Sequence, residues 1–334
     1  MDPLSQASLG ASLSQSFTND RSKQLTALII GALAGMAPDL DVFIRSADDP
    51  MLFLEFHRQF THSLIFIPVG ALLCALVFYP FVRKKLTFPH VYLFSFLAYA
   101  THGLLDACTS YGTQLFWPFS NTRIAWNTVS IIDPLFTLPI IVFIVLAVIK
   151  KNSRYARFGF AYAVIFLCLG VLQYQRAENA LYELVKQRGH EVERTHIKPS
   201  FGNRHVWKLI YEYDGRYYVD AVKLLWHIDY IKGSSIQKLD IKRDFPWLPA
   251  GSQQTKDVER FRWFSDDFLA VNPSDANMIM DVRYSYLPNR INAMWGIELK
   301  KYSMDDDMKE KHVGYVMQNK LTDKIWRRFI EMIF

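Results

Sequence analysis

The chain has 334 residues, of which 51% are hydrophobic and 21% charged, and its formal net charge is +6. These averages hide an asymmetry, because residues 24–175 are strongly apolar whereas residues 176–334 mix charged and aromatic residues as an ordinary folded domain does. Many basic residues flank apolar runs and form no continuous stripe, which argues against a nucleic-acid partner and indicates membrane topology.

Five apolar stretches are expected to cross the membrane as helices. The first, residues 25–44, breaks at Pro38, because proline lacks the N–H and disfavours helix in the residue before it. The motif PDLD, residues 38–41, is therefore predicted to end a helix. The second, residues 64–82, contains no charged residue and is about as long as a bilayer requires. The other three stretches are residues 88–105, 131–149 and 158–174.

Three clusters of basic residues predict the orientation of these helices. They lie at residues 21–23, 83–85 and 150–157. A path with five crossings places all three clusters on one side, which the positive-inside rule makes the cytoplasmic side. The residues that follow Tyr174 are then expected outside the cytoplasm.

The second half of the chain predicts a soluble α+β domain. A hairpin is expected from strands at residues 206–212 and 217–225, because Asp214-Gly215 between them is a turn signal. Further elements are expected as helices at residues 178–188, 257–271 and 321–334 and strands at residues 278–286 and 293–301. The predicted architecture is thus an α-helical polytopic membrane bundle, residues 1–175, followed by an extracytoplasmic α+β domain, residues 176–334.

The predicted topology brings seven ionisable residues to the outer ends of the membrane segments. An ionisable group in a membrane segment is costly unless it is paired, hydrated or bound to a metal, so each one is a candidate functional residue. They are Asp39, Asp41, His57, His62, His102, Asp106 and Asp133.

The motif HGLLD places His102 and Asp106 four residues apart, so both side chains share one face of a helix. The two residues could bind one metal ion together, or the aspartate could orient the histidine as an outer partner. The alternative is a hydrogen bond that only ties two helices together.

The motif HRQFTHS contains His57 and His62, which diverge by about 140° on an ideal helix. We therefore expect them to converge only if the helix starts between them. Arg58 is positioned to clamp a phosphate or carboxylate group. The alternative is a set of polar residues at a membrane interface.

Three aspartates complete the candidate set. Asp39 and Asp41 lie on a broken helix end where both can turn inward, and a bound cation would remove their mutual repulsion. The alternative for this pair is a solvated turn. Asp133 precedes Pro134, so it is either a metal ligand or a helix N-cap followed by proline at the first helical position.

The motifs PDLD, HRQFTHS, HGLLD and TSYGTQLFWPF follow one another in residues 1–175 in an order that resembles the YdjM-like family of membrane-bound metal-dependent hydrolases. The resemblance implies a metal hydrolase in a bacterial or archaeal inner membrane. Many relatives carry a Thr-His pair near the start, where this chain has Ser5-Gln6, so the number of metal ions stays open. Carried over by motif, the ligands are Asp39, Asp41, His57, His62, His102 and Asp106.

Mixed histidine and aspartate ligands suit zinc best, with manganese or iron as alternatives. The expected activity is hydrolysis of an ester or phosphoester in a lipid or lipid-linked substrate at the outer membrane face. Asp39 or Asp41 would act as the base and Arg58 would hold the anionic group. The rival functions are an ion- or proton-coupled transporter and a scaffold whose soluble domain binds a partner.

Overall fold

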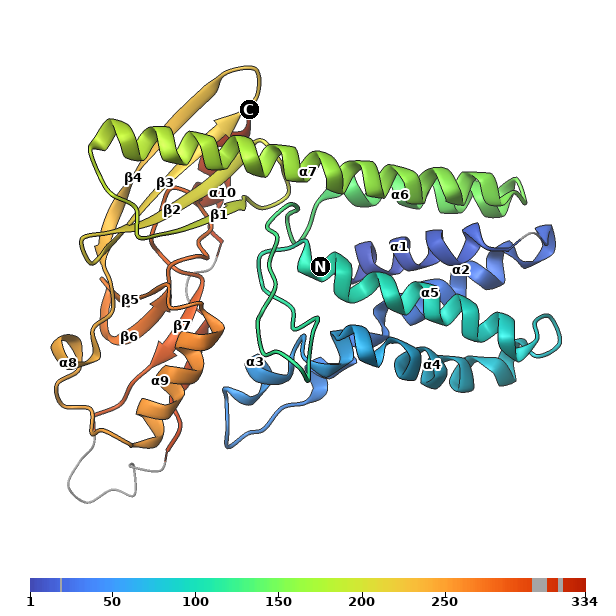
Figure 1. Ribbon diagram of the computed structural model, residues 1–334, viewed down its shortest axis with the longest axis horizontal. Helices are drawn as coiled ribbons and strands as arrows, with labels where there is room; N and C mark the ends of the chain where they lie inside the picture. Colours follow the sequence, from blue (N-terminus) through green and yellow to red (C-terminus); the bar gives the residue numbers. More distant parts are fainter. Residues whose placement is uncertain (19, 302–310, 318–320) are drawn as a thin grey trace. The chain divides into compact units, whose positions relative to one another are not determined.

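The computed structural model describes residues 1–18, 20–301, 311–317 and 321–334, and the chain divides into two compact units (Figure 1). The helical unit contains Met1–Phe43, Phe56–Tyr174 and Phe201–Asn203. The C-terminal unit contains Ile44–Glu55, Gln175–Ser200 and Arg204–Phe334. The sequence alone placed residues 44–55 with the membrane half, but their contacts assign them to the C-terminal unit.

Helices build most of the helical unit. Arg21–Phe43, Leu64–Val82 and Ser153–Arg188 are long and apolar enough to cross a membrane, and Pro134–Ile149 is a shorter apolar helix. The count of five crossings therefore stays a prediction. The helices are α1 (Pro3–Ser16), α2 (Gln24–Met36), α4 (Ile67–Val82), α5 (Phe88–Ala107), α6 (Pro134–Ile149) and α7 (Ser153–Arg188), with the 3-10 segments η1 (Arg21–Lys23), η2 (Ala37–Phe43), η3 (Phe60–His62) and η4 (Leu64–Phe66).

The first helix, α1, was not expected from the sequence. Asp2 caps it by accepting hydrogen bonds from the backbone N–H groups of Leu4 and Ser5. Its serine-rich faces are buried against α2, α5 and α6. A Cβ atom on Gly10 would lie 2.6 Å from the carbonyl oxygen of Gly31 on α2, so small residues are what allow these helices to approach closely. Hydropathy alone does not reveal a buried helix of this composition.

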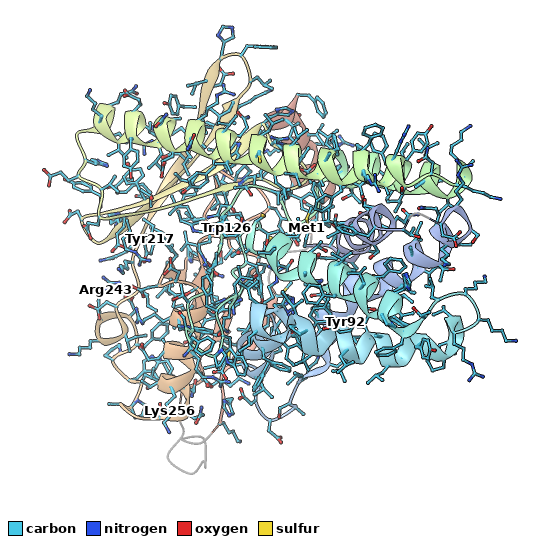
Figure 2. The ribbon with its side chains drawn as sticks, turned by 45° about the vertical axis from the view of Figure 1, so that its right-hand side comes forward. Met1, Tyr92, Trp126, Tyr217, Arg243 and Lys256 are labelled. Carbon is cyan, nitrogen blue, oxygen red and sulfur yellow. The ribbon has the colours of Figure 1, made fainter. Side chains whose placement is uncertain are left out.

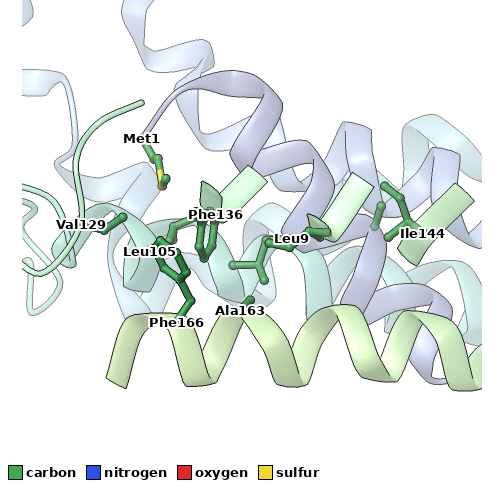
Figure 3. Close-up of a cluster of buried hydrophobic side chains, with 10 residues drawn as sticks. Met1, Leu9, Leu105, Val129, Phe136, Ile144, Ala163 and Phe166 are labelled. Carbon is green, nitrogen blue, oxygen red and sulfur yellow. The ribbon is translucent and has the colours of Figure 1, made fainter. Parts of the chain in front are cut away.

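The core beside α1 joins four helices (Figure 3). Leu9 of α1, Leu105 of α5, Phe136 of α6 and Phe166 of α7 belong to one buried cluster. The rings of Phe136 and Phe166 meet edge to face with their centroids 5.5 Å apart. This packing fixes the end of α5 that carries Asp106.

The C-terminal unit contains two four-stranded antiparallel sheets, ordered β1-β2-β3-β4 and β5-β6-β7-β8. The strands are β1 (Arg194–Pro199), β2 (Val206–Tyr213), β3 (Arg216–Leu224), β4 (Ile228–Gln237), β5 (Leu269–Asn272), β6 (Asp275–Asp281), β7 (Trp295–Glu298) and β8 (Gly314–Met317), and the remaining helices are α3 (Leu52–Phe56), α8 (Ile241–Asp244), α9 (Gln253–Phe264) and α10 (Asp323–Ile333). Tyr217 is buried between the sheets, whereas Arg243 and Lys256 lie at the surface (Figure 2).

The predicted hairpin between β2 and β3 is confirmed, and both turn residues, Asp214 and Gly215, have the positive φ that such a turn requires. Two predictions were partly wrong. The helix expected at residues 257–271 ends at Phe264, because Leu269–Asn272 pairs with β6 as a strand. The separate helices expected at residues 158–174 and 178–188 are one continuous helix, α7.

Candidate metal centre

Four side chains of the helical unit converge at one point, and we call them the metal centre. They are Asp39 from η2, His62 from η3, and His102 and Asp106 from α5. The two histidines and Asp106 are buried, while the side chain of Asp39 is 24% exposed. The centre is therefore enclosed by protein except on the side of Asp39.

The spacing of the converging atoms fits a metal ion. The two Nε2 atoms of His62 and His102 lie 2.9 Å apart, and each lies 3.4 Å from Oδ1 of Asp39. Oδ2 of Asp106 lies 3.3 Å from the His62 nitrogen and 3.6 Å from the His102 nitrogen. Four ligands at zinc bond lengths of about 2.0–2.1 Å would be separated by about 3.3 Å in a tetrahedron. The observed distances scatter around that value.

The far nitrogens of both imidazoles are held by acceptors. Nδ1 of His102 lies 2.6 Å from the carbonyl oxygen of Gly35, so it donates there. Nδ1 of His62 lies 3.2 Å from Oδ2 of Asp41, which accepts its proton. We therefore assign both protons to Nδ1, which leaves the lone pairs of both Nε2 atoms facing the same point.

Two lone pairs that face each other at this distance repel unless a proton or a metal ion lies between them. Burial opposes a charge on His62, yet hydrogen bonding to Asp106, Asp39 and Asp41 raises the pKa of His62 to about 10. A proton thus takes the shared position when no metal ion does. Metal and proton compete for the same lone pairs.

Asp41 organises the loop around the centre instead of pointing into it. Oδ1 accepts from His57 Nδ1 at 2.8 Å, and Oδ2 accepts from the Arg58 backbone N–H at 3.0 Å and the Thr61 hydroxyl at 2.8 Å. Arg58 adopts a φ of +65°, which turns its N–H toward this carboxylate. Asp39, Asp41 and His57 also offer ligand atoms close enough to hold a second ion.

The local chain path explains how His57 and His62 converge, and it differs from the expected one. The α-helix does not start between them, because α4 begins at Ile67 and His62 ends the short 3-10 segment η3. The two rings lie 5.9 Å apart. A helix does start between them, but it is the short 3-10 segment η3, which begins at Phe60, and not the membrane helix α4.

Arg58 lies inside the cluster, which differs from the predicted role as an open clamp. Its Nε lies 3.0 Å from Oδ2 of Asp106, and Nη1 donates to the Thr109 hydroxyl at 3.0 Å. Its guanidinium stands 4.8 Å from the ring centroid of Tyr111, and the side chain is buried. It therefore neutralises and orients Asp106.

Two residues at the start of the chain, Gln6 and Met1, also contact Asp106. Gln6 of α1 donates from Nε2 to Oδ1 of Asp106 at 2.9 Å, and the α-amino group of Met1 contacts the same oxygen. This contribution was not predicted from the sequence because α1 was not predicted, although the small residues Ser8, Ser12 and Ser16 mark a helix face that can pack closely. Burial lowers the pKa of the Met1 amino group, which favours its neutral form.

Asp133 is placed in the alternative role that the sequence left open. Its side chain caps α6 by accepting from the backbone N–H groups of Leu135 at 3.0 Å and Phe136 at 3.3 Å. Among the residues that the structure describes, it is not part of a group spaced to hold a metal ion. The predicted ligand is therefore a helix cap.

The C-terminal unit contains a second group of metal-ligand residues, Asp49, Asp257 and His312, which the sequence analysis did not identify. Arg260 of α9 occupies it: the guanidinium bonds to Asp49 at 2.8 and 2.9 Å and to Asp257 at 2.9 Å, and it also pairs with Glu55. His312 Nδ1 lies 2.9 Å from Asp257. We call these five residues the arginine cluster.

Comparisons with known proteins place the helical part in a family context. A family model described as YdjM inner membrane protein matches residues 1–178. An uncharacterized protein, YfhP of Bacillus subtilis (strain 168), is 31% identical over 109 residues, which are 32% of this chain and 33% of that protein. Inner membrane protein YbcI of Escherichia coli (strain K12) is 32% identical over 108 residues, which are 31% of this chain and 61% of that protein.

The two relatives each match about a third of this chain. The chain covers about a third of YfhP and about three-fifths of YbcI. No solved structure matches the chain.

Proposed function

The chain belongs to the YdjM inner membrane protein family, and we propose that it is a metal-dependent hydrolase of this membrane whose centre is formed by Asp39, His62, His102 and Asp106. The observation that carries the proposal is the convergence of two imidazole nitrogens and two carboxylate oxygens from three separate segments. Zinc is the first choice of metal, with manganese or iron as alternatives. A divalent ion bound there would supply Lewis-acid activation of water and of an ester or phosphoester group.

The charge of the centre supports a divalent cation. Asp39 and Asp106 contribute two carboxylates to the centre, and outside it Asp41 adds a third beside His62 while Arg58 adds one guanidinium beside Asp106. Neutral imidazoles leave this set with an excess of negative charge in buried surroundings, which is unfavourable without a cation.

The proton acceptor is assigned to His57. Asp41 was the expected base together with Asp39, but both oxygens of Asp41 already accept hydrogen bonds. His57 donates from Nδ1 to Asp41, its side chain is 19% exposed, and burial lowers its pKa, so Nε2 is left as the base. Asp39, the partly exposed ligand, offers an oxygen within 4.8 Å of a ring nitrogen of His57.

The substrate is proposed to be an ester or phosphoester of a membrane lipid at the outer face. The support is position: Asp39 lies near the end of Arg21–Phe43, which is apolar and long enough to span a membrane, and His62 precedes a second such segment, Leu64–Val82. A transporter would require ionisable residues at several depths, whereas these residues gather at one end of the helices. A scaffold would tolerate their loss.

Orientation is tested by reporter fusions after residues 85, 126 and 180. The proposed topology predicts a cytoplasmic signal at the first position and outer signals at the other two. A cytoplasmic signal at residue 180 would remove the outer-face substrate from the proposal and leave the metal centre intact.

Activity is tested by screening lipid phosphoesters and esters with the purified protein, alongside a His102→Ala control. We expect hydrolysis that a chelator abolishes, that added metal restores, and that the control lacks. Equal hydrolysis by the control would assign the activity to a contaminant or another site.

A further inference from the structure

An apolar groove opens on the helical unit between α2 with its extension η2 and the helix α4. Its volume is about 550 Å³, within the range of about 300–1,000 Å³ typical of ligand sites. One wall carries Leu33, Met36, Ala37 and Leu40, and the other carries Gly70, Leu73, Cys74 and Val77. Both sets follow the i, i+3, i+4, i+7 spacing of a single helix face.

The floor of the groove is closed by packing against α5. Cys74, Ala98 and Tyr99 belong to one buried cluster there, and α2 and α4 both pack on α5. The rims are open, since Leu33, Leu40, Leu73 and Val77 are all exposed. The residues that line the groove carry no charge, so its occupant must be a hydrocarbon chain or something equally apolar.

One end of the groove reaches the metal centre. Thr61 lines the groove, and its hydroxyl donates to Oδ2 of Asp41 at 2.8 Å and lies 3.0 Å from Nδ1 of His62. The hydroxyl of Tyr99, another lining residue, donates to the carbonyl oxygen of Thr61 at 2.9 Å. Leu40 lies between Asp39 and Asp41 in the chain. An apolar channel is thus continuous with a polar centre.

We infer that this groove holds one acyl chain of a glycerophospholipid whose headgroup lies at the metal centre. The walls belong to Arg21–Phe43 and Leu64–Val82, two segments suited to cross a membrane, so bilayer lipid is the medium that reaches the open rims. Seven residues of helix extend about 10 Å, which remains within one leaflet of a hydrocarbon core about 30 Å thick. The groove can therefore hold the part of an acyl chain that lies nearest the headgroup.

The groove would orient the bound lipid and would add little to the affinity of the protein for it. Inside a bilayer an acyl chain gains little hydrophobic free energy from moving onto protein, because lipid tails are as apolar as leucine. A fixed chain would instead present the headgroup bond to Asp39 and His57 in one geometry. The role of the headgroup rests on the proposed function, whereas occupancy of the groove can be measured without activity.

The test uses the full-length protein in vesicles of phosphatidylethanolamine and phosphatidylglycerol, with a trace of phosphatidylglycerol that carries a diazirine on one acyl chain. After photolysis, peptide mapping locates the adducts. We expect adducts concentrated on residues 33–40 and 70–77, and a several-fold loss of these adducts in Leu73→Trp and in Leu33→Trp, which fill the groove from opposite walls.

The matched control is Leu72→Trp on the same helix. Leu72 is exposed but does not line the groove, so this variant should label as the wild type does. Bound metal, measured in every sample, should be unchanged in all three variants. Adducts spread evenly over lipid-facing residues, or equal labelling of Leu73→Trp and Leu72→Trp, would overturn the inference. Groove labelling by a protein without hydrolase activity would instead uphold the groove and refute the proposed function.

Discussion

The metal centre and the arginine cluster contain the same types of residue, yet they differ in the source of their positive charge. In the arginine cluster, the guanidinium of Arg260 already bonds to Asp49, Asp257 and Glu55. In the metal centre, Arg58 reaches Asp106, and the two imidazole nitrogens still face each other at 2.9 Å. Clustered histidine and aspartate therefore indicate a metal site only where the protein supplies no cation at the point of convergence.

The largest expected effect is loss of metal from the metal centre. His62→Ala and Asp106→Ala each remove one of four converging ligands, so we expect affinity to fall by about 100-fold or more. His312→Ala, in the arginine cluster, is the control and should retain the full metal content. Metal analysis of the purified proteins measures this loss. If both His62→Ala and Asp106→Ala retain the full metal content, the ligands are assigned incorrectly.

A substitution in the arginine cluster should lower the stability of the protein and leave its metal content unchanged. Arg260→Met leaves the buried carboxylate of Asp257 without its guanidinium, which should cost about 3 kcal/mol of unfolding free energy. The control is Arg243→Met, whose exposed pair with Asp244 should contribute about 0–1 kcal/mol.

Denaturation of the two arginine variants in detergent, followed by tryptophan fluorescence, measures this difference. Metal content should match the wild type in both. Loss of metal in Arg260→Met would mean that the arginine cluster and the metal centre are not energetically separate.

A smaller effect is expected at Asp41, which touches His62 and His57 from outside the centre. Asp41→Asn should weaken metal binding by about 10-fold to 100-fold without abolishing it, because Nδ1 of His62 loses its carboxylate partner. Asp48→Asn, an exposed position in the following segment, is the control. Titration against a competing chelator gives both affinities, and equal values would exclude an orienting role for Asp41.

A change of a single pH unit is expected to have the smallest effect on metal affinity. The carboxylates raise the pKa of His62 to about 10, so the metal-free centre holds a proton below that pH and must release it when a metal binds. Affinity should therefore rise about tenfold per pH unit between about pH 6.5 and 8.5. Chelator competition across this range measures the slope, and a flat profile would show that His62 is already deprotonated.

Much of the secondary structure was predictable because its signals are local. The apolar run of residues 64–82 and the break at Pro38 predicted α4 and the end of α2, and the pair Asp214-Gly215 predicted the hairpin of β2 and β3. The helix α1 was not predictable in the same way, since its burial depends on close approach to α2 and not on hydropathy. The strand β5 was predicted as part of a helix from its local sequence pattern. Its pairing with β6 overrides that local preference.

The sequence predicted six of the residues that the structure groups as possible metal ligands, and it did not predict the role of each. The sequence by itself determined that Asp39, His62, His102 and Asp106 fall at the ends of apolar segments, because ionisable residues stand out against such runs. Only the tertiary structure decided that Asp41 binds the outer side of His62, that Arg58 pairs with Asp106, and that Asp133 caps a helix. Those roles depend on which atoms meet across segments distant in the chain, and spacing along one segment holds no information about such contacts.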